Sequence, residues 1–362
     1  MPNTGEITGY AAAALASLSD DQVQFLRNLP KAELHAHLNG CIPISVLKSI
    51  ADERFSEPLL DSSALPDAVR SSIQLLQEGV TLNEINDFFG LFPAIYALTS
   101  NPKALATAAR AVLSLFLESD ETIENSQPQA AYLELRSTPR ETTEMTRTQY
   151  LETVLDEVEK YPPQRSALIV SLDRRMDPAV AEEIVDIAVR LRQKGRRIVA
   201  VDLCGDPLAG DMKSFEKVFK LAKDGGLAVT MHIAETTDNS VEDTLQLLSY
   251  GPDRLGHATF LDGAARQKVF SSNVPVEICL SSNLLCKTTR SLEEHHIKHY
   301  LEQNHPIAIC TDDTLPFRNS LLGEYALLLA APPIGLGLSA TEVERIARMS
   351  MESRFPLLSR AN

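Results

Sequence analysis

Two histidines one residue apart, His35 and His37, lie in the stretch LHAHLNG of residues 34–40. Side chains alternate along a β-strand, so both imidazoles would point to the same face and could hold one metal ion together. The alternative is a pair of half-buried histidines at a strand end, because a His-x-His motif is a weak signal on its own. The rest of the chain has to decide between these two interpretations.

Further candidate ligands end later apolar segments of the chain. His232 ends one such segment, and Asp312 follows another. With His35 and His37 they make a nitrogen-rich set of four side chains, which suits one Zn²⁺ ion with room for a water. For each residue alone, an ordinary hydrogen-bonded polar side chain is the alternative. The pattern as a whole favours a metal site.

Three more residues would make such a site catalytic. Glu235 lies three residues after His232, where its carboxyl could hand a proton to a nitrogen of the substrate. His257 and Asp313 could orient and deprotonate a water beside the metal. Together these groups describe hydrolytic attack on a carbon that bears a leaving amine.

The elements that must position these side chains follow a regular rhythm. Short apolar, β-branched segments alternate with amphipathic segments of helical period, which is typical of parallel βα units. Eight strands are predicted, at residues 32–38, 131–136, 167–172, 198–203, 227–232, 254–257, 275–280 and 306–310. They indicate an α/β protein with one (β/α)₈ TIM barrel, whose catalytic groups lie at the carboxyl ends of the strands.

Two segments fall outside this rhythm. Residues 1–30 predict an N-terminal helix in two pieces, the second starting at a Ser19–Gln22 capping box, which would cover the barrel floor or a neighbouring surface. Residues 41–100 predict a helical insertion after the first strand, and such insertions are commonly lids. No Gly-, Pro- or Ser-rich linker divides the chain, so residues 1–362 are expected to form one domain.

Composition narrows the functional class. A net charge of −15 argues against a nucleic-acid partner, which needs clustered Lys and Arg. The five cysteines form no Cys-x-x-Cys pair, and Cys279, Cys286 and Cys310 are expected to be small core residues. No apolar run approaches a membrane span, and the first 30 residues lack the basic start of a signal peptide. We therefore expect a cytoplasmic monomer that binds no membrane.

Residues 137–140, with the sequence STPR, could bind a phosphate. Their hydroxyls, backbone N–H groups and guanidinium match its oxygens. A surface position for Arg140 stays open, because no sequence signal fixes the direction of its side chain. Arg136 and Arg174 are expected to form structural ion pairs at strand ends.

Two other polar groups are expected to play no part in the chemistry. A predicted surface helix carries His295, His296 and His299, which lack the further ligands that would hold an ion. Ser282 and its neighbours are expected to close a loop, since no base is placed to activate a serine. Both groups are interpreted as structural.

Four spaced motifs carry a resemblance over nearly the whole barrel. HAHLNG at 35–40, HIAE at 232–235, LGH at 255–257 and TDD at 311–313 resemble the adenosine and AMP deaminase superfamily. Within it, the chain is most similar to the adenosine deaminase-like group, the N6-methyl-AMP deaminases. That similarity rests on Asn39, where ordinary adenosine deaminases usually have Asp, on YLELRSTPR at 132–140 and on DRR at 173–175.

The resemblance implies a role for each matching residue. It implies one zinc ion per chain, with the ligands His35, His37, His232 and Asp312. It implies Glu235 as proton donor to the purine N1, His257 beside the attacking hydroxide, and Asp313 with the backbone of Gly205 at the purine ring. The implied substrate contacts are His37, Asn39, Tyr96, Ser137, Thr138, Pro139, Arg140, Asp173, Gly205 and Asp313. Tyr96 departs from the His that relatives carry there, and it could donate a hydrogen bond but carry no positive charge.

The resemblance also implies an activity, the hydrolysis of N6-methyl-AMP to IMP and methylamine. Adenosine or adenine deamination is the alternative, and the phosphate pocket distinguishes the two. Cytidine-type zinc deaminases use a Pro-Cys-x-x-Cys signature that this chain lacks. A binuclear amidohydrolase would need a lysine on strand four, which ends DLCG at 202–205, so one metal is expected. A non-catalytic zinc-bound scaffold would be expected to have lost Glu235, His257 or Asp313, and all three are present.

Overall fold

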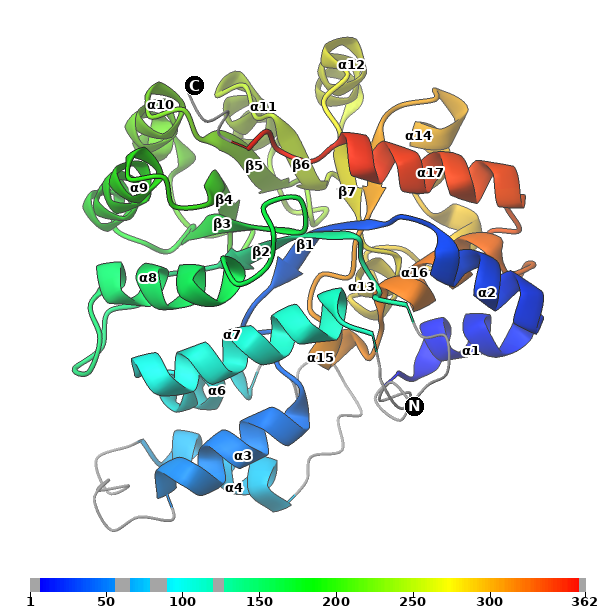
Figure 1. Ribbon diagram of the computed structural model, residues 1–362. Coiled ribbons are helices and arrows are strands. Elements are labelled where there is room, and N and C mark those ends of the chain that lie inside the picture. Colours follow the sequence, from blue (N-terminus) through cyan, green and yellow to red (C-terminus); the bar gives the residue numbers. More distant parts are fainter. Residues whose placement is uncertain (1–6, 56–65, 79–89, 120–126, 358–362) are drawn as a thin grey trace.

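Eight parallel strands follow one another in chain order around a barrel in the computed structural model, which describes residues 7–55, 66–78, 90–119 and 127–357 (Figure 1). The strands are β1 Ala32–His37, β2 Tyr132–Ser137, β3 Ser166–Asp173, β4 Ile198–Cys204, β5 Ala228–Ile233, β6 Arg254–His257, β7 Val276–Ile278 and β8 Ile307–Ile309. The predicted (β/α)₈ TIM barrel is confirmed. The last two strands are shorter than predicted.

The seam between β8 and β1 lies at the candidate metal ligands. Among the described residues, the two strands meet in an isolated bridge between Ala36 and Asp312. The Asp312 N–H donates to the His35 carbonyl at 2.8 Å. Asp312 has a φ of +61°, in the left-handed region that L-residues rarely adopt. The closure of the barrel therefore fixes the backbone that carries two of the predicted ligands.

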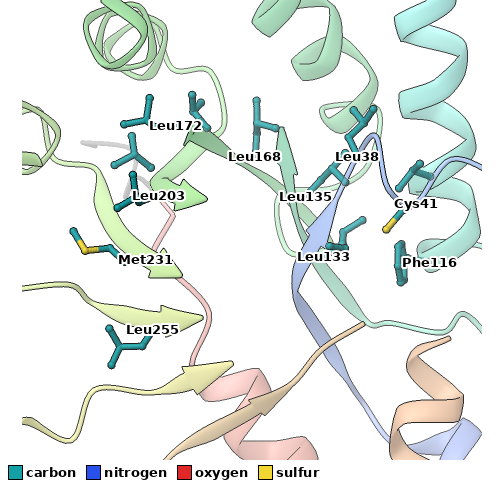
Figure 2. Packing of buried hydrophobic residues seen from close by; sticks show 14 of the residues in the cluster. Leu38, Cys41, Phe116, Leu133, Leu135, Leu168, Leu172, Leu203, Met231 and Leu255 are labelled. Atoms are coloured by element: carbon teal, nitrogen blue, oxygen red, sulfur yellow. The ribbon is translucent and has the colours of Figure 1, made fainter. Parts of the chain in front are cut away.

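The helices cover the outside of the barrel, and leucines of the strands pack beneath them, with Leu133 and Leu135 near Phe116 (Figure 2). They are α7 Pro102–Leu117, α8 Arg147–Val158, α9 Pro178–Gln193, η2 Met212–Phe215, α10 Glu216–Asp224, α11 Val241–Ser249, α12 Gly263–Ser272, α13 Leu280–Leu285, η3 Leu292–Glu294, α14 Ile297–Glu302, α15 Thr314–Phe317, α16 Leu321–Leu329 and α17 Ala340–Glu352. Side-chain caps begin many of them, as at Asn101 and Asp177. Across the described ranges no helix has the length and apolar character needed to span a membrane. The cytoplasmic location and the monomeric state stay predictions.

The N-terminal region forms two helices, α1 Gly9–Ser17 and α2 Asp20–Asn28, as predicted from residue 7 onward. Ser19 and Gln22 make both hydrogen bonds of the predicted capping box. The pair packs on α16, so it covers a neighbouring surface. The floor is covered by Phe355, whose ring lies 3.8 Å from the guanidinium carbon of Arg254.

The insertion after β1 contains α3 Ile44–Phe55, α4 Asp67–Glu78 and α6 Phe92–Leu98, while residues 56–65 and 79–89 lie outside the described ranges. Arg54 of α3 anchors it, because its guanidinium donates to the carbonyls of Ala97 and Leu98 at 3.2 and 3.0 Å. The same guanidinium pairs with Glu144, beyond β2, at 2.8 Å. Helix α6 is thereby held beside the barrel mouth. The lid role of residues 41–100 stays a prediction.

Within the described ranges, five fully buried charged side chains form ion pairs with one another inside the barrel. Arg136 pairs with Asp202 at 3.0 Å and with Glu277, as expected for a structural arginine. Arg254 pairs with Glu134 at 2.7 Å and with Glu277. A buried charge is tolerated only when it is paired and hydrogen-bonded, so these contacts hold one another in place.

Replacing Arg254 with Met should destabilise the barrel strongly. Removing one partner of a buried ion pair leaves an uncompensated charge and costs about 3–5 kcal/mol. Urea unfolding followed by circular dichroism would measure the loss in free energy of unfolding. Arg190→Met is the matched control, since Arg190 pairs with Asp186 on the exposed face of α9 at 3.2 Å, and exposed pairs contribute under about 1 kcal/mol. Equal losses in the two variants would contradict the structural importance of the interior pairs.

Candidate metal centre and active site

Three imidazole nitrogens converge at the carboxyl ends of β1 and β5. His37 Nε2 lies 3.3 Å from His35 Nε2 and 3.2 Å from His232 Nε2. Asp312 Oδ1, just after β8, lies 3.7 Å from the Nε2 atoms of both His35 and His37. The four residues predicted as metal ligands are therefore brought together at one rim of the barrel.

The interior charges of the barrel orient two of these imidazoles. His35 Nδ1 donates to Glu277 Oε2 at 2.6 Å, so its Nε2 carries a lone pair. His232 Nδ1 lies 3.0 Å from Asp202 Oδ1. Burial alone would raise the pKa of Glu277, but the guanidinium groups of Arg136 and Arg254 hold this pKa at about 2. A carboxylate behind each metal-facing imidazole is the usual arrangement of outer-shell partners.

The electrostatics at the cluster favour neutral imidazoles at His35 and His37 and a positive charge at His232. Burial lowers the pKa of His37 to about 4 and lowers that of His35 well below its ordinary value. Burial would also lower the pKa of His232, but the Asp202 carboxylate raises it to about 9. A tetrahedral ion with metal–nitrogen bonds of about 2.0 Å separates its ligand nitrogens by about 3.3 Å, which matches the spacing here. His35, His37 and His232 thus form a candidate metal-binding cluster.

The backbone turns sharply just after the strands that carry the site. Ala234, His257, Ala258 and Asp312 all have φ between +45° and +61°. Such left-handed residues cost free energy and are concentrated at functional sites. The turn at Ala234 places Glu235 on the same cavity as His232.

The three predicted catalytic residues lie around the cluster. His257 Nε2 is 3.9 Å from Asp312 Oδ2 and 4.0 Å from Glu235 Oε2. Glu235 Oε1 and Asp313 Oδ1 are buried and have no hydrogen-bond partner in the described part of the chain. Burial, and then the neighbouring Asp312 carboxylate, raise the pKa of Asp313 well above its usual range. A Cβ at Gly40 would lie 1.9 Å from Asp313 Oδ1, so only glycine leaves space for this carboxyl.

One cavity of about 630 Å³ joins the cluster to the loops of the other half of the rim. Nearly all of the predicted site residues line it, and the two that do not are His35, buried behind the cluster, and Pro139. The ligands and acids come from the ends of β1, β5, β6 and β8, whereas the loops after β1 to β3 contribute the predicted ribose and phosphate contacts. The volume is in the range of cavities that bury a small ligand.

Arg140 points into this cavity, which decides the question left open by the sequence. Its guanidinium carbon lies 2.9 Å from the centroid of the Tyr96 ring on α6. Among the described residues no carboxylate pairs with it, and its buried Nε has no hydrogen-bond partner. Burial raises the pKa of Tyr96 to about 12, so its hydroxyl remains a neutral donor. Tyr96 holds the arginine in place while leaving its charge available to an anion.

Asp173 and Gly205 form another part of the wall. Arg175 donates to Asp173 Oδ1 from its backbone and its Nε, both at 2.8 Å. Burial would raise the pKa of Asp173, but the hydrogen bonds from Arg175 hold this pKa below its usual range. Gly205 has a φ of +97°, and a Cβ there would lie 2.6 Å from Asp173 Oδ1. Glycine is therefore required for the close approach of the two loops.

Two structural interpretations from the sequence are wrong in part. His295 and His296 are buried and precede α14, so the predicted surface helix carries only His299 as an exposed histidine. Cys286, predicted to be a core residue, is exposed and lines the cavity. Cys279 and Cys310 are buried as predicted, because they stand at the ends of β7 and β8.

The sequence argument missed several residues that support the site. Glu277 and Asp202 hold the histidines, and Ser282 Oγ donates to Asp312 Oδ2 at 2.8 Å. Arg174 was expected to be structural, and it pairs with Asp243 at 3.2 Å and donates to the His232 carbonyl. Acids within apolar strand segments are unusual, and this signal alone could have identified Glu277 and Asp202 as partners of buried cations or imidazoles.

Comparison with known proteins agrees with this geometry. The family model described as Adenosine deaminase matches residues 30–359. The N6-Methyl-AMP deaminase of Danio rerio is 34% identical over 325 residues, which cover 86% of this chain and 87% of that protein. The apo structure of the N6-methyl-AMP deaminase from Arabidopsis thaliana has a TM-score of 0.77 and 31% identity, and covers 92% of this chain and 94% of its own. An Arabidopsis ADAL structure complexed with IMP has a TM-score of 0.76 and 30% identity over the same shares.

The burial of His296 predicts that the protein loses stability as the pH falls. Burial lowers its pKa from the ordinary 6.5 to about 3, so unfolding takes up a proton between these values. The free energy of unfolding should decrease by up to about 1.4 kcal/mol per pH unit from this group alone. Denaturant unfolding at several pH values should give a shallower decrease for His296→Gln. The exposed His299→Gln should follow the wild type, and a wild-type slope for His296→Gln would contradict the assignment.

Proposed function

Because the chain belongs to the adenosine deaminase family, we propose that it hydrolyses N6-methyl-AMP to IMP and methylamine. It is a hydrolase that acts on a C–N bond of a purine. One observation carries the choice of substrate, namely that a single cavity joins the histidine cluster to an unpaired arginine on the loop after β2. The relatives named above support the same substrate, two by their names and one by the IMP in its structure.

We assign one zinc ion to His35, His37, His232 and Asp312. Three imidazoles and one carboxylate form a donor set typical of zinc, and the carboxylates behind His35 and His232 support it. When bound, the ion supplies the Lewis acidity that makes a water nucleophilic near neutral pH. The seam of the barrel brings His35 and Asp312 together through a backbone hydrogen bond.

The protein groups around the ligands then move the protons. His257 is placed to hold the attacking water and take its proton, because its Nε2 lies within 4.0 Å of both Asp312 and Glu235. Glu235 has a carboxyl oxygen without a partner, available to protonate the purine N1. Water adds to the purine C6 and gives one proton to His257, which passes it to the exocyclic nitrogen as the C6–N bond breaks and methylamine leaves. The second water proton returns to Glu235 as C6 becomes a carbonyl. Asp313 and the Gly205 backbone would contact the ring.

The half of the rim formed after β1 to β3 would bind the ribose and phosphate. Asn39 and Asp173 line it near Ser137 and Thr138, and Arg140 adds the cation. A charged donor that has no carboxylate partner among the described residues favours a phosphate over an uncharged group. Adenosine or adenine remains the alternative substrate, since Tyr96 brings no positive charge to this rim. A non-catalytic scaffold would have no need of two further acids and a histidine around the cluster.

A substrate panel tests the proposal. Purified protein should turn over N6-methyl-AMP with a higher kcat/KM than AMP, adenosine or adenine, measured by absorbance and by methylamine release. Arg140→Met should raise the KM for the nucleotide by about 10–100-fold, the worth of a charged hydrogen bond, and leave the KM for a nucleoside unchanged. A preference of the wild type for the unphosphorylated nucleoside would refute the assigned substrate.

Glu235→Gln should separate metal binding from proton transfer. The amide keeps the shape of the side chain but cannot donate an acidic proton, so kcat should fall by about 10²–10⁴-fold. Zinc content, measured by mass spectrometry of the metal, should stay at one ion per chain. His232→Gln is the control that should lose zinc together with activity. Normal turnover by Glu235→Gln would rule out this mechanism.

A further inference from the structure

The peptide that follows β6 is held in a strained conformation. His257 and Ala258 have φ values of +59° and +45°, two consecutive left-handed residues that are not glycine. The Ala258 N–H donates to the Ile233 carbonyl at 3.1 Å, so the turn is tied to β5 on one side. The direction of the His257 imidazole depends on this turn, because the side chain leaves the backbone at its first strained residue.

Two buried side chains from one helical segment hold the carbonyl oxygens of this turn. His296 Nε2 donates to the His257 carbonyl at 3.0 Å, and the Tyr300 hydroxyl donates to the Ala258 carbonyl at 2.9 Å. His296 is 7% exposed and Tyr300 is 3% exposed. They stand four residues apart, at the N-cap and in the body of α14, and so share one face of the segment. Each of the two consecutive strained carbonyls thus has its own side-chain donor.

His295 extends the same support to the neighbouring wall of the cavity. Its Nδ1 accepts the Ile297 N–H at 3.1 Å, so its proton lies on Nε2 and is donated to Asn283 Oδ1, also at 3.1 Å. Asn283 lines the cavity. The rings of His295 and His296 stack with centroids 4.4 Å apart, which leaves neither ring free to rotate alone.

We propose that His296 and Tyr300 are positioning residues for the reaction, which hold the turn after β6 so that the His257 imidazole points at Asp312 and Glu235. The inference rests on the proposed function, in which His257 acts on the attacking water. Neither donor is among the described residues that line the cavity, so both act through the backbone of residues 257 and 258. They should affect kcat and leave substrate and metal binding unchanged.

Tyr300→Phe tests one donor with the loss of a single oxygen atom. Loss of an outer-shell partner typically costs about 10-fold or more in activity, so kcat should fall by about 10-fold with KM and zinc content unchanged. Tyr325→Phe is the matched control, because Tyr325 is a buried tyrosine whose hydroxyl bonds to Ser350 Oγ at 3.1 Å, between α16 and α17. It should lose similar thermal stability and keep the wild-type kcat. Equal kcat values in the two variants would overturn the proposal.

His296 allows a rescue experiment. A glutamine amide can place a donor near the position of the histidine Nε2, whereas leucine fills the space without a donor. His296→Gln should therefore keep most of the wild-type kcat, and His296→Leu should lose about 10-fold. Equal loss in both variants would show that only the packing of the imidazole matters, against the proposal. Should His296→Leu not fold, Tyr300→Phe still decides.

A crystal structure of zinc-loaded Tyr300→Phe gives a readout that does not depend on turnover. We expect the Ala258 carbonyl to rotate away and the His257 imidazole to leave its place beside Asp312. If the turn and the imidazole keep their wild-type positions in this variant, the inference is overturned, whatever the kcat of the variant. If the wild type deaminated no purine, the proposed function would fail, while the position of His257 in the variant would still test the positioning role.

Discussion

The shared carboxylate of Glu277 is the contact on which the interior depends. It accepts hydrogen bonds from His35 and Arg254 and pairs with Arg136. The interior pairs contain three carboxylates and two guanidinium groups, which leave one excess negative charge in a region of low dielectric constant. A divalent ion held with the Asp312 carboxylate carries one net positive charge, so a filled site would neutralise the barrel. The ion pairs and the histidine cluster are therefore one electrostatic unit.

This electrostatic unit also explains how the histidine side chains at the rim are held in fixed orientations. The carboxylates of Asp202 on β4 and Glu277 on β7 belong both to the interior ion pairs and to the hydrogen bonds that hold His232 and His35. A side chain that is hydrogen-bonded behind its ring loses little further entropy when it binds an ion. His35 and His232 are prepared in this way, whereas His257 depends on its backbone and on donors from α14. The two imidazoles proposed as ligands and the imidazole of His257 are thus positioned by two different means.

Much of the fold and of the ligand set could be predicted because the signals are local. Short stretches of sequence are enough to identify the strand period, helix caps such as Ser19 and Asp177, and polar residues at strand ends. The barrel topology then places the carboxyl ends of the strands at one rim. The direction of Arg140 and the burial of His296 depend on which distant segments pack against them. Local sequence carries no such information, so Arg140 stayed undecided and His296 was placed on the surface.

The candidate metal site lies at the seam of the barrel, so it forms only when the first and the last strand meet. The residues that meet there, His35 and Asp312, come from opposite ends of the barrel sequence. During synthesis, the site can therefore form only after the eighth strand has left the ribosome. A bound ion would then cross-link the first strand of the barrel to the segment after the last. Metal binding would therefore follow the completion of the barrel. Without an ion, the first and last strands would be joined only by hydrogen bonds such as those from Asp312 N–H to the His35 carbonyl and from Thr311 N–H to the Glu33 carboxylate.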